Sequence, residues 1–108
     1  MVPMQGEAIR SRVQGMWNGT AVVSLCIDKD AQPVGEMMIT TTGMLEPDEE
    51  DAILDQVADD IYDAMDRLSK RKLRNDDDIS ETVRLAARRS FRRLLDKKPI
   101  TDVHLIRI

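Results

Sequence analysis

The chain has 108 residues, of which 42% are hydrophobic and 33% are charged, and its formal net charge at pH 7 is -4. This length suits one domain with a single modest core, and the composition is typical of a globular protein rather than of a disordered one. No apolar run approaches the roughly 18 residues that a membrane-spanning helix needs, so we expect no membrane association.

The residue inventory excludes several kinds of chemistry. One cysteine, Cys26, and one histidine, His104, cannot supply the clustered ligands of a zinc site. The sequence contains no GxxxxGK[ST] phosphate loop, no GxGxxG turn and no GxSxG nucleophile elbow. We therefore expect this chain by itself to bind no metal or cofactor and to have no enzymatic activity. The lone cysteine favours a reducing, cytoplasmic setting, and the first residues do not resemble a secretory signal.

The N-terminal third predicts a linker followed by a β-hairpin. We assign residues 1–16 to a linker segment and residues 17–108 to the domain. From Thr20, the sequence TAVVSLCID alternates between apolar and less apolar positions, which predicts a strand. Its apolar face consists of Ala21, Val23, Leu25 and Ile27. A turn at DKDAQP leads into VGEMMITTT, which predicts a second, antiparallel strand that ends at Gly43.

The middle of the chain, EPDEEDAILDQVADDIYDAMDRLSKRK, predicts one long helix from Glu46 to Lys72. Pro47 and the acidic residues after it mark the start of this helix, and apolar residues then recur at three- and four-residue spacing. The basic residues from Arg67 onward mark its end. Acidic residues at the start and basic residues at the end both complement the helix dipole.

The C-terminal third predicts a second helix and a final strand. LRNDDD reads as a loop, and Asp78 with Glu81 forms a cap pair for a helix from Ile79 to about Asp96. The apolar stripe of this helix contains Ile79, Val83, Ala87, Phe91 and Leu94. Pro99 ends the helical pattern, and ITDVHLIRI has the composition of a strand.

The order β-β-α-α-β predicts an α+β fold, a two-layer sandwich in which two helices cover one face of a three-stranded sheet. The uncovered face would carry Val22, Ser24, Cys26, Met37 and Met38. This face is too apolar to be left in water, and so small a sheet also exposes its strand edges. We therefore expect a homo-oligomer, or docking on another domain, through this face.

The stretch RLAARRSFRRLLDKKP, residues 84–99, contains seven basic residues. At about 100° per residue, the five arginines among them form two rows that both lie broadly opposite the apolar stripe. The first row is Arg84, Arg88 and Arg92, and the second is Arg89 and Arg93. Residues 79–98 carry a net charge of +5, and residues 46–72 carry a net charge of -6.

Two interpretations of these arginines differ in function. They can solvate a pair of oppositely charged helices that pack side by side, or they can contact the phosphates of RNA. The aromatic content of 3% offers no stacking platform for bases, which argues against a dedicated RNA-binding module. We favour the first interpretation and keep an auxiliary RNA contact as the alternative. A protein-recruiting adaptor that uses a sheet edge or the acidic helix is a third hypothesis.

Two stretches are similar to a known family. The run RVQGMWNGTAVVSLCIDKDAQPVG, with its basic lead-in, a glycine, a strand ending in Asp and a turn, resembles the start of the C-terminal domain of ribonuclease J. ETVRLAARRSFRRLLDKKPITDVHLIRI, with its basic helix, Lys-Lys-Pro breaker and final hydrophobic strand, resembles the end of that domain. The resemblance extends from Gly6 to Ile108, and KKPITDVHLIRI is most similar to alphaproteobacterial members.

The ribonucleases J are bacterial metal-dependent 5′ exonucleases and endonucleases that act in RNA maturation and decay. They combine a metallo-β-lactamase domain, an inserted β-CASP domain and this small C-terminal domain. The resemblance implies that zinc is bound by an HxHxDH motif in the β-lactamase domain, and this chain, with His104 alone, has no counterpart of those ligands. It also implies a non-catalytic module that supports dimer or tetramer assembly and contacts the catalytic domain of the same protein.

Overall fold

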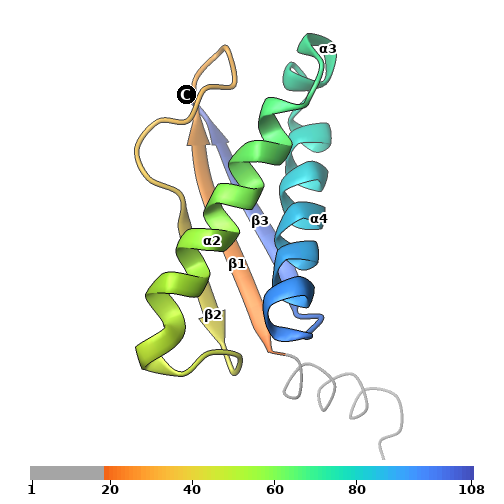
Figure 1. Ribbon diagram of the computed structural model, residues 1–108. Coiled ribbons are helices and arrows are strands. Elements are labelled where there is room, and N and C mark those ends of the chain that lie inside the picture. The colour runs from red at the N-terminus through yellow and green to blue at the C-terminus, as the bar shows by residue number, and fades with distance from the viewer. Residues whose placement is uncertain (1–18) are drawn as a thin grey trace, which may run out of the picture.

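The computed structural model describes residues 19–108, so the predicted linker segment over residues 1–16 lies outside the described residues. The elements follow the order β1, β2, α2, α3, α4 and β3 (Figure 1). The strands are β1 (Thr20–Ile27), β2 (Met38–Thr42) and β3 (Ile100–Arg107). The helices are α2 (Pro47–Asp66), α3 (Lys70–Leu73) and α4 (Asp76–Leu95). The predicted α+β fold is confirmed, with the short helix α3 as an addition.

The sheet has the order β2-β1-β3, with β1 antiparallel to β2 and parallel to β3. In this register, Val23 of β1 lies between Ile39 of β2 and Val103 of β3. A parallel neighbour requires a long crossover connection, which the helices between β2 and β3 supply. The long helices α2 and α4 lie side by side on one face of the sheet, as predicted (Figure 1).

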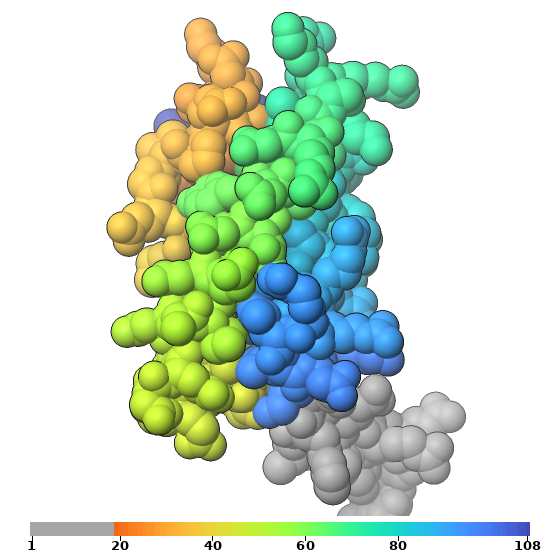
Figure 2. All heavy atoms as spheres, viewed as in Figure 1, coloured from red at the N-terminus to blue at the C-terminus, as the bar shows by residue number. Residues whose placement is uncertain are grey.

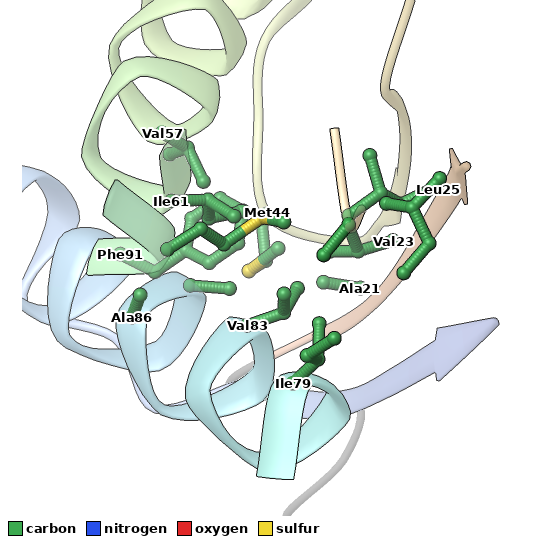
Figure 3. Packing of buried hydrophobic residues seen from close by; sticks show 14 residues of the cluster. Ala21, Val23, Leu25, Met44, Val57, Ile61, Ile79, Val83, Ala86 and Phe91 are labelled. Atoms are coloured by element: carbon green, nitrogen blue, oxygen red, sulfur yellow. The ribbon is translucent and has the colours of Figure 1, made fainter. Parts of the chain in front are cut away.

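The core lies between the sheet and the helix layer. The predicted apolar face of β1 is buried along its whole length, while the residues between are partly exposed. On α4, Ile79, Val83, Ala87 and Phe91 are fully buried, and Leu94 is half-buried. Figure 3 shows side chains of β1, α2 and α4 meeting, with Phe91 close to Ile61 of α2. The predicted apolar stripe of α4 is therefore confirmed.

The helix predicted from Glu46 to Lys72 is wrong in its last part. It begins as expected, because Glu46 and Glu49 form a capping box. However, α2 ends at Asp66, and the Ser69 side chain then accepts a hydrogen bond from the Lys72 backbone N–H at 3.3 Å, which starts the separate helix α3. The basic residues therefore lie in α3, and the last turn of α2 contains none.

The predicted loop before α4 and its predicted cap at Asp78 are also wrong. Asn75 is the N-cap, since its Oδ1 accepts hydrogen bonds from the backbone N–H groups of Asp77 at 2.9 Å and Asp78 at 3.2 Å. The three aspartates after Asn75 form the first turn of α4, where their charge complements the helix dipole. The helix ends as predicted, with Asp96 in the left-handed conformation at its C-cap.

The second strand is shorter than predicted. The antiparallel pairing with β1 is confirmed, but β2 begins only at Met38. Gly35 has a φ of 73°, which an extended strand does not allow, and Pro33 contributes only an isolated bridge to Ile27. The chain therefore leaves the sheet between Pro33 and Met38 and rejoins it for five residues.

Gly19 directly precedes β1 in a conformation that favours glycine. It has a φ of 82°, and a Cβ atom there would lie 2.7 Å from the carbonyl oxygen of Thr42 and 2.2 Å from Cγ of Met44. We expect Gly19→Ala to lower the free energy of unfolding by about 2–3 kcal/mol, because steric overlap adds to backbone strain. Urea denaturation followed by circular dichroism measures this loss.

Gly35→Ala is the matched control for Gly19→Ala. Gly35 also has a positive φ, but nothing lies within 4 Å of the added Cβ. Its substitution should therefore cost backbone strain alone, about 1 kcal/mol. Equal losses in the two variants would contradict the steric argument for Gly19.

Candidate interaction surfaces

The five arginines predicted as phosphate contacts all lie on α4, but they do not form one free surface. Arg84 forms an ion pair with Glu81, and this contact lowers the pKa of Glu81 and raises that of Arg84. Arg93 forms an ion pair with Asp60 of α2. The remaining three are exposed and form no ion pair with any described residue: Arg88, Arg89 and Arg92.

Asp60 connects the two long helices. Its carboxylate accepts hydrogen bonds from Ser90 Oγ at 2.6 Å and from Gln56 Nε2 at 3.2 Å, besides the pair with Arg93. Ser90 is 2% exposed and the Asp60 side chain 27% exposed, so this polar contact is partly buried in the α2–α4 seam. The hydrogen bond from Ser90 is the main reason that the pKa of Asp60 lies below its ordinary value of 3.8. Partial burial opposes this shift, and Gln56 and Arg93 add to it.

A groove of about 420 Å³ follows the seam between α2 and α4. It is lined by Asp60, Asp63, Ala64, Arg67, Ala86, Arg89, Ser90 and Arg93. The prediction that both arginine rows lie opposite the apolar stripe is therefore wrong for Arg89 and Arg93, which border α2. The predicted side-by-side packing of an acidic and a basic helix is confirmed by the pair between Asp60 and Arg93.

The second candidate surface is the sheet face that α2 and α4 leave uncovered. Paired residues of neighbouring strands share a face, so the register identifies its members. They are Thr20, Val22, Ser24, Cys26, Met38, Thr40, Thr42, Ile100, Asp102, His104 and Ile106. We call these residues the open sheet face. Within residues 19–108, no helix or strand lies over it (Figure 1).

Large apolar side chains are exposed on the open sheet face. Met38 is 66% exposed, Ile100 57% and Ile106 55%. Of the residues predicted for the assembly face, Val22, Ser24, Cys26 and Met38 lie here. Met37 does not, because it packs against the hydrophobic core. The two isoleucines were missed, although the alternation in ITDVHLIRI could have identified them once β3 was placed beside β1.

The single cysteine and the single histidine of the chain, Cys26 and His104, lie on the neighbouring strands β1 and β3, and both are on the open sheet face. In the described part of the chain, no group of three or more His, Cys, Asp or Glu residues is arranged to hold a metal ion. None of the described helices combines the length and the apolar character needed to cross a membrane.

Arg107, at the end of β3, was missed by sequence reasoning and makes more connections than the arginines of α4. Its Nε donates to Asp76 Oδ1 at 2.8 Å. Its Nη1 donates to the carbonyl oxygens of Asp28 at 3.2 Å and Lys29 at 3.1 Å, and its Nη2 donates to that of Leu73 at 2.9 Å. Three of these four acceptors are backbone carbonyls, which leave no signature in a sequence. One side chain thus joins the β1–β2 turn, α3 and α4.

Comparison with models of known protein families shows similarity to the family described as "Ribonuclease J C-terminal domain", whose model matches residues 7–108. The match includes every described residue. A search of curated proteins found no match.

The Asp60 contacts predict a pH-dependent effect on stability. Because the folded-state pKa of Asp60 is lowered, its stabilising contribution is present above pH 3.8 and is lost as the pH falls through the lowered value. We expect Asp60→Asn to reduce the free energy of unfolding by about 1 kcal/mol at pH 7. This difference from the wild type should shrink in acid, where the wild-type carboxyl is protonated. Urea denaturation at several pH values measures it.

Asp59→Asn is the control, since it makes the same charge change on the same helix. Asp59 is exposed, and its side chain has no hydrogen bond or ion pair within residues 19–108. It should therefore change stability by a few tenths of a kcal/mol at most. A pH-independent loss in Asp60→Asn would show that the amide substitution disturbs packing and not the charged contacts.

Proposed function

The chain belongs to the ribonuclease J C-terminal domain family, and from this membership we propose that it is a non-catalytic assembly module of a bacterial metal-dependent ribonuclease. The parent enzyme would act on RNA as a 5′ exonuclease and endonuclease in RNA maturation and decay. In this proposal the chain holds copies of the enzyme together and supports its catalytic domain. The setting would be the cytoplasm, where such an RNA-degrading enzyme meets its substrates.

The observation that carries this proposal is the open sheet face. Three large apolar side chains on it are more than half exposed: Met38, Ile100 and Ile106. Half-buried Val22 and Cys26 on the central strand add to this apolar area, which is interspersed with polar residues such as Ser24 and Thr40. An apolar patch of this kind on a small domain marks an interaction site, because covering it removes hydrocarbon surface from water.

The occupant we propose is a second copy of this chain. The helix side is less suited to self-association, because α2 contains nine acidic residues and α4 five arginines, and a contact there would have to remove these charges from water. On the open sheet face, only Asp102 and His104 can carry a charge. A two-fold axis would place the same apolar residues on both sides of the contact, which is the usual symmetry of homodimers. Pairs of such dimers would give a tetramer.

The non-catalytic part of the proposal is supported by the residues that are missing from the sequence. A zinc site needs three or four ligands, usually several histidines or cysteines, and this chain has one of each. We propose that zinc belongs to the catalytic domain of the parent protein.

The auxiliary RNA contact through the α4 arginines stays a prediction. Two of the five arginines are engaged with carboxylates, which leaves Arg88, Arg89 and Arg92 for phosphates. Arg88 and Arg92 lie one turn apart on exposed positions, so they remain the better pair for such a contact.

The assembly proposal predicts the effect of one substitution on the open sheet face. Ile106→Asp places a charge where the second copy would pack, and a buried unpaired charge costs several kcal/mol. We expect the wild-type chain to form dimers or larger species as its concentration rises, and the variant to stay monomeric over the same range. Size-exclusion chromatography with multi-angle light scattering measures the molar mass directly.

Leu85→Asp is the matched control for this experiment. Leu85 is an exposed apolar residue on α4, so the variant has the same change in charge on the opposite side of the molecule. It should assemble as the wild type does. A wild-type chain that is strictly monomeric at high concentration, or equal loss of assembly in both variants, would contradict assembly through the open sheet face.

A further inference from the structure

Basic side chains gather at the end of the molecule where α3 meets the β1–β2 turn. Residues 67–74, RLSKRKLR, contain five basic residues and no acidic one. In the structure, α3 and the residue after it expose four of these cations, and the β1–β2 turn adds a fifth. We call this set the α3 tip: Lys29, Lys70, Arg71, Lys72 and Arg74.

The α3 tip is hollowed as well as charged. A cleft of about 380 Å³ lies between the β1–β2 turn and α3, and Figure 2 shows the two segments projecting at the same end of the molecule. This cleft is lined by Lys29, Asp30, Gln32, Lys70, Leu73 and Arg74. A second hollow of about 640 Å³ is lined by Arg71, Arg74, Asn75, Asp76, Asp77 and Arg107. Arg74 borders both hollows, so the cations follow one connected surface.

The cations of the α3 tip are not neutralised by the protein. None of the five forms an ion pair with a described residue. Among the carboxylates beside them, Asp28 Oδ1 accepts the backbone N–H groups of Asp30 and Gln32, and Asp76 pairs with Arg107. Asp30 and Asp77 also line the hollows, so the five cations outnumber the two carboxylates there that form no ion pair with a described residue. The α3 tip therefore presents positive charge to an external anion.

Arg107 holds the two walls of the cleft together. It donates from one guanidinium group to the carbonyls of Asp28 and Lys29 in the β1–β2 turn and to the carbonyl of Leu73 in α3. The side chain of Arg107 is only 24% exposed, which fits a structural role. Lys29 and Arg74 are thus carried by segments with a set spacing, and a preorganised site binds an anion with less loss of entropy.

We propose that the α3 tip binds the phosphate backbone of single-stranded RNA, an inference that rests on the proposed function as a module of a ribonuclease. A row of unpaired cations along a cleft attracts a polyanion and releases its counterions. Within residues 19–108 the aromatic side chains are Tyr62, half-buried, and Phe91, buried, so bases have no exposed ring to stack on. The contact is therefore with the backbone and independent of sequence.

Much of the acidic charge of the chain lies away from the α3 tip, although the first turn of α4 begins beside the tip with Asp76, Asp77 and Asp78. The acidic first turn of α2 lies at the end of the molecule opposite α3 (Figure 1). At physiological ionic strength, charges separated by more than about 8 Å are largely screened. The local charge of the α3 tip therefore counts for more than the net charge of -4.

The α3 tip is distinct from the arginine face of α4. Arg88 follows the N-cap Asn75 by thirteen residues, which corresponds to about 20 Å along the helix at 1.5 Å per residue. The two surfaces can therefore be tested separately. The tip variant is Lys70→Glu with Arg74→Glu. The α4 control is Arg88→Glu with Arg92→Glu, which makes the same change in net charge on the alternative RNA surface, so comparing the two variants shows which surface binds.

The experiment measures binding of a fluorescein-labelled 12-nucleotide oligouridine to the 108-residue chain by fluorescence anisotropy. If five phosphates are neutralised, the slope of log affinity against log salt is about -3.5, so a rise from 50 to 200 mM salt should weaken binding about 100-fold. At 50 mM salt the tip variant should bind at least about tenfold more weakly than the wild type, and the α4 control less than about threefold. Urea denaturation confirms that both variants are folded.

Three results would overturn the proposal. They are no anisotropy change with wild type at 50 mM salt, a loss in the α4 control as large as in the tip variant, and displacement of the RNA by polyglutamate at equal charge concentration. The last result would identify the tip as a site for an acidic protein. Ile106→Asp, which disrupts the proposed assembly, should bind RNA normally. Light scattering on the same samples therefore separates failure of the assembly proposal from failure of the RNA site.

Discussion

The fold depends on the parallel pairing of β1 with β3. β1 is the central strand, and β3, from the opposite end of the chain, pairs with it over eight residues. A parallel pair cannot be closed by a tight turn, so the connection must cross one face of the sheet, and α2 and α4 form that crossing. Their apolar stripes then cover the buried face of β1. The other face of the sheet receives no cover from the described elements, and this asymmetry leaves the open sheet face exposed.

Charge contributes to the surfaces of this domain more than to its core. The acidic α2 and the basic α4 lie side by side. The polar contact between them is concentrated at Asp60 of α2, which accepts a hydrogen bond from Ser90 and forms an ion pair with Arg93, both on α4. Exposed ion pairs elsewhere stabilise a protein by about 0–1 kcal/mol each. Two groups of exposed cations form no ion pair with a described residue, namely Arg88, Arg89 and Arg92 on α4 and the α3 tip. The apolar open sheet face is separate from both, so the proposed assembly and the proposed RNA contact need not compete.

Local patterns predicted most of the elements but not their boundaries. The alternation in β1 and the spacing of apolar residues in α4 reflect which side chains face the core, and both were confirmed. The break between α2 and α3 was missed because the residues around it also favour helix. Ser69, the N-cap of α3, and Asn75, the N-cap of α4, were the local signals of the two helix starts. Met37 was assigned to the wrong face because side chains of adjacent residues in an extended segment point to opposite sides, so Met37 packs on the core while Met38 lies on the open sheet face.

The sequence by itself determined the fold class, the apolar residues of the core, the acidic and basic character of the two long helices, and the resemblance to the family that the comparison later confirmed. These properties are local, since each follows from residues within one element or from a contiguous run. Only the tertiary structure placed Ile100 and Ile106 beside Val22 and Cys26, and it alone brought Lys29 next to α3. The first set of neighbours follows from the pairing of β1 with β3, and the second from the hydrogen bonds of Arg107 to backbone carbonyls. The periodicity of residues along the chain encodes neither of these contacts.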